Sequence, residues 1–320
     1  MNRFAYFVLV IVVCCSVGVV SSAGRDGNNR PSYEFYLDAN SLVIRAGDEV
    51  LLSYRYGAAP PKSYVRELFT PSGLGVLLDS PPDHVHHHGL MFACVVDGVD
   101  FWVDFVSHSE SSEVASLGRQ EHQRFSSVGA DSAGRQVGLV EDLAWVESKQ
   151  GKTLLKEQRT IRLHRHRGLD ATLLTWESRF TVPAGKESAV LTGAHYHGLG
   201  LRFIRTMDAT GKFRNPDDNP GVVFRGQERL TRSPWCAYTA QVEGKTVTVA
   251  MFGHPDNPRH PTTWFTMAEP FAYLSATMRL HDKPLTIVEG KPLKLSYAVA
   301  LWDRPVKTQE IDRLYERWSK

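Results

Sequence analysis

Short runs of β-forming residues recur along almost the whole chain, and this pattern constrains the fold more than any other feature of the sequence. Between Tyr33 and Trp302, alternating or apolar stretches are separated by Gly, Pro, Asn and Asp. Such runs are typical of strands, and their spacing is typical of antiparallel sheets. The sequence therefore predicts an all-β fold, a large antiparallel sandwich of two stacked sheets.

The predicted strands share β-branched or aromatic residues and have turn-forming residues at their ends. They span residues 33–37, 42–46, 49–56, 75–78, 90–96, 99–103, 119–127, 136–148, 154–164, 169–182, 198–203, 235–242, 245–252, 264–267, 272–278 and 293–302.

One stretch near the C-terminus has a helical period instead. Within residues 307–318, Ile311, Leu314, Tyr315 and Trp318 stand at positions i, i+3, i+4 and i+7. This spacing predicts a short amphipathic helix that packs on a sheet, with a structural role. No change of composition marks a linker, so we expect residues 33–320 to form a single domain.

The first 23 residues have the composition of a signal peptide. Arg3 precedes an apolar stretch from Phe4 to Val20, and small residues lead to Ala23. We expect cleavage there and export to the periplasm or the extracellular space, although an uncleaved anchor is the alternative. Residues 24–32 are rich in Gly, Asn and Arg, which predicts a disordered leader.

Two cysteines, Cys94 and Cys236, remain after such a cleavage, and each lies in an apolar run. Buried free thiols are common in protein cores, so we expect no bridge between them.

The charge distribution argues against nucleic acid as a partner. The formal net charge is +2, and no block of Lys and Arg occurs. No glycine-rich nucleotide loop, Gly-x-Ser-x-Gly elbow or Cys-x-x-Cys pair is present either. We therefore expect a small molecule or a glycan as the ligand, and no membrane contact beyond the leader.

The densest group of chemically active residues lies between Asp83 and Phe92, where four of the thirteen histidines occupy positions 84, 86, 87 and 88. In an extended chain, His84, His86 and His88 would share one face and His87 would point the other way. Imidazoles can transfer protons near neutral pH, although a polar sheet face that happens to be rich in histidine is the alternative.

A second group is His195-Tyr196-His197, followed by glycines and by Arg202. In a strand the two imidazoles would share a face, and the glycines would permit close approach of a ligand. A glycine-containing bulge with partly exposed histidines is equally compatible with the spacing.

The third group runs from His254 to Trp264 and contains three prolines. A stiff loop of this kind can present His254, Asn257, Arg259 and His260 in fixed directions. The alternative is a turn that merely closes a hairpin.

Together these stretches resemble a bacterial family of unknown function (DUF6807-type), whose members often carry a methane-oxygenase (PmoA-like) label. The resemblance covers about residues 66–302 and rests on three motifs, in which x marks an unconstrained position. They are Asp83-His84-x-His86-His87-x-Gly89-Leu90 with Asp100-Phe101-Trp102, Gly198-Leu199-Gly200-Leu201-Arg202, and His254-Pro255-x-Asn257-x-Arg259-His260-Pro261-x-x-Trp264. The resemblance implies a galactose-mutarotase-like sandwich and a carbohydrate-related role. We do not expect the oxygenase label to describe this chain, since its only apolar span is the leader.

The chain departs from the family pattern at several motif positions. The family usually has Pro at position 85, Arg at 88, Lys-Glu-Gly at 195–197 and His at 265. This chain has Val85, His88, His195-Tyr196-His197 and Phe265 instead. Chemistry that needs the missing Glu or His is therefore not expected here.

We interpret the chain as an exported carbohydrate-active protein that uses histidines for general acid and base catalysis. The predicted catalytic residues are His86, His87, His195 and His260. The predicted substrate-binding residues are His84, His197, Arg202, Trp235, Tyr238, His254, Asn257, Arg259 and Trp264. We expect the three histidine-bearing stretches to meet in one pocket.

Two alternatives remain open at this point. One is a non-catalytic glycan-binding module. The other is a metalloenzyme with His84, His86 and His195 as ligands, because the His-x-His spacing suits a metal on a strand. No cofactor is expected in the other two interpretations.

Overall fold

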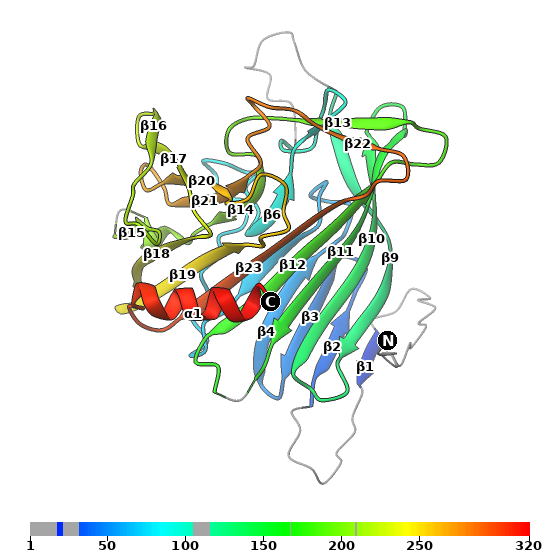
Figure 1. The fold of residues 1–320 in the computed structure, drawn as a ribbon. Coiled ribbons are helices and arrows are strands. Elements are labelled where there is room, and N and C mark those ends of the chain that lie inside the picture. The colour runs from blue at the N-terminus through cyan, green and yellow to red at the C-terminus, as the bar shows by residue number, and fades with distance from the viewer. Residues whose placement is uncertain (1–17, 22–31, 105–115, 167, 209) are drawn as a thin grey trace.

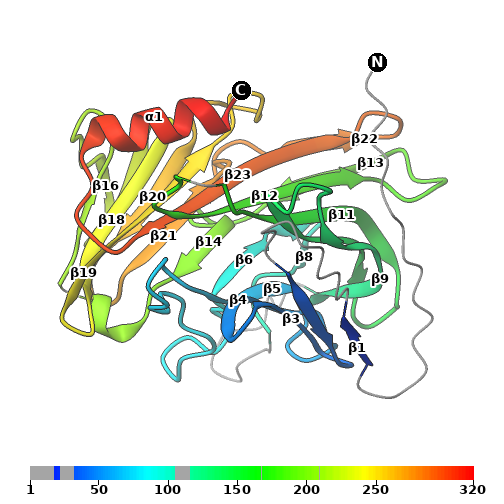
Figure 2. The same ribbon diagram turned by 90° about the horizontal axis from the view of Figure 1, so that it is seen from below.

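The computed structural model describes residues 18–21, 32–104, 116–166, 168–208 and 210–320. Two antiparallel sheets pack face to face, and a short helix lies across the outside of one of them (Figures 1 and 2). The all-β sandwich with a C-terminal helix is thereby confirmed. A third, four-stranded sheet at one end of the sandwich was not predicted.

The larger sheet has eleven strands in the order β1-β2-β3-β4-β5-β6-β14-β21-β20-β17-β16. In that order its strands are Gly18–Ser21, Glu34–Leu37, Ser41–Ala46, Glu49–Arg55, Tyr64–Leu68, Leu90–Ala93, Gly198–Arg202, Tyr273–Thr277, Thr263–Met267, Glu228–Arg232 and Val222–Arg225.

The second large sheet has eight strands in the order β15-β18-β19-β23-β12-β11-β10-β9. In that order they are Lys212–Arg214, Trp235–Val242, Lys245–Gly253, Leu293–Trp302, Thr172–Thr181, Thr153–His164, Gln136–Glu147 and Gly118–Ala130. The four-stranded sheet consists of β22 (Leu285–Val288), β13 (Ser188–Thr192), β7 (Val95–Val96) and β8 (Val99–Asp100). A 3-10 turn, η1, spans Arg205–Met207.

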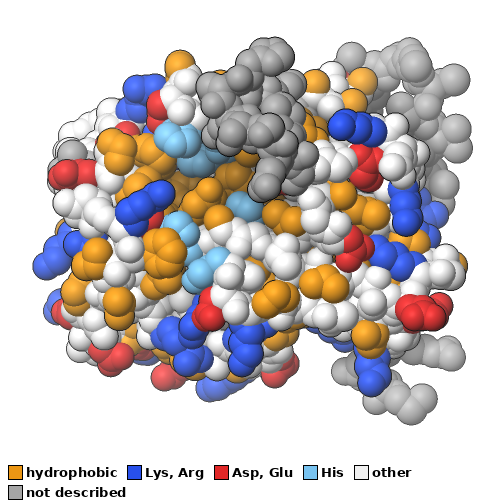
Figure 3. All heavy atoms as spheres, turned by 90° about the horizontal axis from the view of Figure 1, so that it is seen from above, with side chains coloured by type: hydrophobic (Ala, Val, Ile, Leu, Met, Phe, Trp, Pro, Cys, Tyr) orange, Lys and Arg blue, Asp and Glu red, His pale blue; other side chains and the backbone are white. Residues whose placement is uncertain are grey.

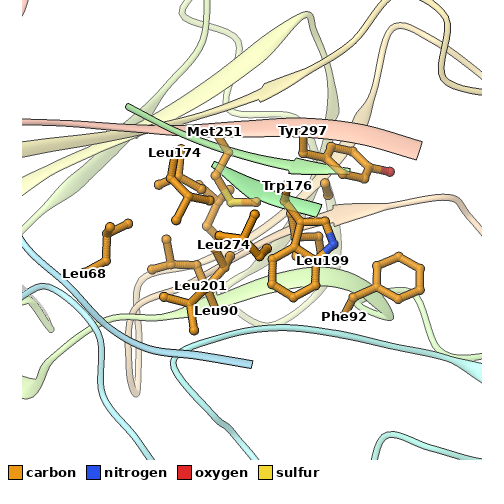
Figure 4. Close-up of a cluster of buried hydrophobic side chains, with 14 of the residues drawn as sticks. Leu68, Leu90, Phe92, Leu174, Trp176, Leu199, Leu201, Met251, Leu274 and Tyr297 are labelled. Atoms are coloured by element: carbon orange, nitrogen blue, oxygen red, sulfur yellow. The ribbon is translucent and has the colours of Figure 1, made fainter. Parts of the chain in front are cut away.

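The hydrophobic core fills the space between the two large sheets. Leu90 and Phe92 of β6 point into it from the larger sheet, and Leu174 and Trp176 of β12 point into it from the eight-stranded sheet (Figure 4). Side chains alternate along a strand, so Met91 faces outward and joins a separate aromatic cluster. The strand period therefore sends every second residue of these strands to an outer face.

Helix α1 (Thr308–Trp318) covers part of the outer face of the eight-stranded sheet. Ile311 is fully buried, and it packs with Leu314 against Trp235 and Phe252. The predicted packing role of the helix is thereby confirmed.

Several short strands escaped the sequence prediction, and one predicted strand is absent. Residues 75–78 make only isolated bridges through Gly75 and Leu77. In contrast, β17 forms although its sequence, Glu-Arg-Leu-Thr-Arg, is mostly polar, because it pairs with β20 along four residues. Cys94 and Cys236 are buried and free, as expected.

The N-terminal predictions remain predictions. Residues 1–17 and 22–31, with most of the proposed signal peptide and leader, lie outside the described residues. Residues 18–21 form β1, which pairs with β2. Within the described part of the chain, no helix is long and apolar enough to cross a membrane.

Shortening Ile311 to Ala should lower the free energy of unfolding by about 2–4 kcal/mol, because the change leaves a cavity under the helix. Glu316→Ala, on the exposed side of the same helix, should change it by less than about 0.5 kcal/mol. Urea denaturation followed by tryptophan fluorescence measures both values. Equal effects of the two changes would contradict the packing role.

Candidate functional site

The candidate site lies on the outer face of the larger sheet, over β6, β14, β20 and β21. Histidine side chains gather there around a patch of hydrophobic side chains (Figure 3). We call this region the histidine hollow. It consists of His84, His86, His87, His195 and His197 around the aromatic side chains Trp102, Tyr196, Phe265, Phe271 and Tyr273.

The first histidine group folds as two tight turns, not as the extended chain that the sequence analysis considered. The amide of His84 donates to the carbonyl of Pro81 at 2.9 Å, and the amide of His87 donates to that of His84 at 2.9 Å. The rings of His84 and His87 stack at 4.7 Å, and the ring of His86 lies 4.8 Å from that of His87. The prediction that His87 points away from its neighbours is therefore wrong.

His88 turns the other way and is held between two carboxylates. Its Nδ1 lies 2.7 Å from Asp79 Oδ1, and its Nε2 lies 2.7 Å from Asp104 Oδ2. The hydroxyl of Tyr64 donates to the second oxygen of Asp79 at 3.0 Å. These bonds draw His88 into the protein, and this pull explains why it does not share a face with His84 and His86.

A buried lysine joins this network to the hollow. Lys62 Nζ lies 2.6 Å from Asp104 Oδ1 and donates to the carbonyl of Trp102 at 2.5 Å. It also donates to the carbonyl of His86 at 3.4 Å. Because this cation bonds to both segments, it fixes the His86 turn relative to Trp102.

His197 stacks on Trp102 with their ring centres 4.6 Å apart. A strand through His195 and His197, one of the two interpretations of this stretch, does not form: residues 195–196 make a turn, and β14 begins at Gly198. A side chain at Gly193 would place its Cβ 2.2 Å from His197 Nδ1, so only glycine permits this packing.

His195 forms a hydrogen-bonded pair with a carboxylate. Its Nε2 lies 2.9 Å from Glu228 Oε2, and the other oxygen of Glu228 accepts a hydrogen bond of 2.6 Å from Arg225. Phe224 stacks on the imidazole with a centroid distance of 3.7 Å. The ring of His195 is thereby held on two sides, while no described residue gives its Nδ1 a hydrogen bond.

Aromatic rings connect the two histidine groups. Tyr273 lies 5.0 Å from His87 and 6.2 Å from Phe265, and Phe265 lies 5.4 Å from His195. Two of the three predicted stretches therefore border one hollow.

Burial determines the charge state of these imidazoles. Burial, together with the positive charge of Lys62, lowers the pKa of His86 to about 4 and that of His197 to about 3. The pKa of His87 is lowered too, first by burial and then by His86. Burial also lowers the pKa of His195, although Glu228 opposes this effect. The imidazoles of His86, His87, His195 and His197 are therefore neutral at neutral pH.

Several buried polar atoms in the hollow lack a hydrogen-bond partner among the described residues. They are His87 Nδ1, His197 Nδ1, Tyr273 OH, and Nε and Nη1 of Arg202. The guanidinium of Arg202 lies 3.6 Å from the centre of the Phe271 ring and donates to Asp83 at 3.1 Å. Buried polar groups are normally paired, so these atoms have unused hydrogen-bonding capacity beside the site.

The third predicted stretch does not reach the hollow, and this corrects the expectation of one shared pocket. The side chain of Asn257 donates to the carbonyl of Ser296 at 2.7 Å and accepts from its amide at 2.7 Å, which ties the loop to β23 of the other sheet. His254 and His260 lie near each other, and Arg259 bonds to backbone carbonyls such as that of Lys283.

The three predicted stacking residues Trp235, Tyr238 and Trp264 are fully buried. Trp235 packs under helix α1, and Trp264 donates to the carbonyl of Ser233 at 2.9 Å inside the sandwich. Core packing accounts for all three, so they do not form part of the hollow.

The described residues contain no group of three or more His, Cys, Asp and Glu side chains arranged to hold a metal ion. His84 and His86 lie close together, with ring centres 5.8 Å apart, but His195 lies beyond the aromatic rings.

Sequence reasoning missed Lys62, Asp104, Glu228 and Tyr273, which all contact the site histidines. The sequence contained one signal for this part of the site. Trp102, their neighbour, belongs to the Asp-Phe-Trp motif on which the family resemblance rests. The others come from separate strands and loops, and only the fold brings them near.

The folded protein should lose stability as the pH falls from about 6.5 toward 3. Since folding lowers the pKa of His197 to about 3, the unfolded chain binds protons in this range that the folded chain does not. The free energy of unfolding of His197→Gln should therefore fall less steeply than that of the wild type, by up to about 1.4 kcal/mol per pH unit. Urea titrations at several pH values measure both slopes, and parallel curves would contradict the buried neutral state.

Comparison with known proteins gives a family and distant structural neighbours. No curated protein sequence matches the chain. The galactosidase domain of the α-galactosidase–sucrose kinase AgaSK is 9% identical, with a TM-score of 0.41 over 89% of this chain and 42% of that one. The GH36 α-galactosidase AgaA of Geobacillus stearothermophilus is 12% identical, with a TM-score of 0.40 over 86% of this chain and 40% of that one. This chain thus spans about two fifths of those α-galactosidase chains.

A putative aldose 1-epimerase from Klebsiella pneumoniae is 12% identical, with a TM-score of 0.36 over 95% of this chain and 96% of that one. The model of a family of unknown function (DUF6807) matches residues 41–316, which is most of the sequence, so the chain belongs to that family.

Proposed function

We propose that the protein is exported, binds a sugar or sugar derivative in the histidine hollow and acts on it by proton transfer. His195 is the proton acceptor, and His86 and His87 contact the reacting oxygen from the opposite side. The observation that carries the proposal is the bond between His195 and Glu228 beside aromatic rings and unpaired imidazole nitrogens.

The carboxylate of Glu228 selects one tautomer of His195. A carboxylate accepts a hydrogen bond from Nε2–H, so the proton of the neutral ring stays on Nε2 and the lone pair lies on Nδ1. No described residue bonds that nitrogen, and a substrate hydroxyl or an acidic C–H group can therefore reach it. A carboxylate that orients an imidazole base and stabilises its protonated form is a recurrent catalytic arrangement.

The other imidazoles are suited to hold an oxygen atom. His86 and His87 are neutral at neutral pH because burial lowers the pKa of each. A neutral imidazole donates one N–H group to a substrate oxygen, and Nδ1 of His87 is unpaired. Arg202 adds two unpaired N–H groups beside them.

The aromatic lining suits a ring with both apolar and polar faces. Tyr196 is only partly buried and Phe224 is exposed, and both rings lie beside the imidazole of His195. Sugar rings have C–H faces that pack on aromatic side chains and hydroxyls that need hydrogen bonds.

A glycan-binding function without turnover is the second candidate. The pKa values of about 4 for His86 and about 3 for His197 lie far from neutrality. Efficient general acid catalysis needs a pKa near the working pH, so these two residues favour binding over proton donation. The two candidate functions differ in the role of His195, which is a base in the first and only a binding residue in the second.

The test is to incubate the purified protein with a panel of aldoses, sugar acids and oligosaccharides and to follow binding and conversion by NMR. For a converted substrate, His195→Ala and Glu228→Gln should each lower turnover by at least about 100-fold, because both remove the oriented base. His86→Ala should weaken binding as well. The matched control is His260→Ala, which lies outside the hollow and should keep the activity.

Each outcome assigns the function. Binding without conversion supports the glycan-binding module. Conversion that His195→Ala leaves intact contradicts the proposed base, and a protein that binds no member of the panel contradicts the sugar-binding role altogether.

A further inference from the structure

A second pocket lies on the opposite side of the sandwich, on the outer face of the eight-stranded sheet. Its volume is about 500 Å³, and side chains of β10, β11, β12 and β23 line it together with Trp318 at the end of helix α1. The strands are uncovered beside this end of the helix (Figure 1). No side chain of the histidine hollow lines it, so it is a separate site.

Two cations stand side by side on the floor of this pocket. Arg179 of β12 is directly opposite Lys294 of β23, and both side chains are exposed. Like charges in directly opposite positions destabilise a sheet. The described residues supply no carboxylate to either cation, whereas the neighbouring Arg162 pairs with Glu177 at 2.5 Å. The Arg179 and Lys294 pair is therefore a place where an anion would relieve repulsion.

The loop at one wall of the pocket is rigidly built. Asn257 bonds both backbone groups of Ser296, and the amide of His254 donates to the carbonyl of Ser296 at 3.1 Å. The amide of Asp256 donates to Nδ1 of His254 at 3.2 Å, so the proton of the neutral imidazole lies on Nε2. His254 thereby presents a fixed N–H donor at the pocket wall.

Trp318 forms the other wall. Its Nε1 donates to the hydroxyl of Thr175 at 2.9 Å, and His164 Nε2 lies 2.8 Å from the same hydroxyl. The rings of His254 and Trp318 meet edge to face at 5.5 Å. The indole is fixed at its nitrogen and only partly buried, so an aromatic surface is left beside the polar floor.

We propose that this pocket binds an acidic oligosaccharide, with a carboxylate or sulfate group between Arg179 and Lys294. The ring hydroxyls bond to Gln158, which is opposite Arg179, and to Nε2–H of His254, while a sugar ring packs on Trp318. The lining also contains Arg162, which pairs with Glu177, and the exposed carboxylate of Asp256. Arg179 and Lys294 are thus two cations without a carboxylate partner among mainly polar side chains, which matches an occasional acidic group on a polyhydroxylated chain. A nucleic acid would need a longer row of cations along its phosphates.

The pocket also gives a role to the His254 to His260 stretch, which is remote from the hollow. Asn257 fixes the loop, and the loop fixes His254 at the wall. This role does not depend on the chemistry of the hollow.

The experiment is calorimetric titration of the purified protein with three matched probes, namely a galacturonate oligomer, a sulfated galactan oligomer and a neutral galactan oligomer. At least one acidic probe should bind saturably and at least about tenfold more tightly than the neutral one, since each charged hydrogen bond is worth more than 1 kcal/mol. Raising NaCl from about 50 to about 300 mM should weaken that binding.

Variants locate the site. Arg179→Gln and Lys294→Gln should each weaken binding of the acidic probe by about tenfold, and Trp318→Ala should weaken it too. Lys245→Gln, which removes an exposed cation from a hairpin elsewhere on the eight-stranded sheet, is the matched control and should leave the affinity unchanged. His195→Ala should also leave it unchanged, and that result separates this site from the hollow.

The two acidic probes distinguish a carboxylate site from a sulfate site. The proposal is overturned if neither binds, if the neutral probe binds equally well, or if Arg179→Gln and Lys294→Gln both retain wild-type affinity. Loss of binding in His195→Ala would also overturn it, because the acidic chain would then occupy the hollow.

Discussion

The histidine hollow depends on one buried charge network, in which Lys62, Asp104, His88 and Asp79 follow one another at bonding distance. Taking a single one of these charges out of water would cost several kcal/mol, so the network is stable only when it is complete. Its lysine bonds to the backbone of both Trp102 and His86. Lys62 therefore sets the positions of both Trp102 and the turn that carries His86.

The same network gives a physical account of a departure from the family pattern. The resemblance leads us to expect Arg at position 88, and this chain has His88. The ring of His88 has a carboxylate oxygen 2.7 Å from each nitrogen. A neutral imidazole donates a hydrogen bond to one such oxygen, and an imidazolium donates to both in opposite directions. His88 thus keeps the function of a buried donor between two acids while it occupies less space than Arg. It supports the site from inside the protein, whereas the rings of His86 and His87 lie in the hollow.

The sequence predicted the elements that have a clear period and missed those that depend on pairing. The strand at 293–302 and the helix ending at Trp318 were found because their apolar residues recur at strand or helix spacing. The polar strand β17 has no such period and was not predicted. Glu228, the partner of His195, lies in this strand, so it was not identified either. The turn at His84 to His87 was considered as an extended chain, because the hydrogen bonds of His88 to Asp79 and Asp104 span 9 and 16 residues and leave no local pattern.

The separation of the two candidate sites follows from strand alternation. In β12, Leu174 and Trp176 fill the core, so Thr175, Glu177 and Arg179 must face outward. In β6 the same rule sends Met91 to the opposite outer face, where it packs under the histidine hollow. Each sheet therefore turns one side to the core and leaves the other side for a candidate site. Buried imidazoles and unpaired buried atoms characterise the hollow, whereas two adjacent surface cations characterise the pocket on the eight-stranded sheet. The two proposals therefore assign different parts of a carbohydrate to the two faces: a ring to be acted on and an acidic chain to be held.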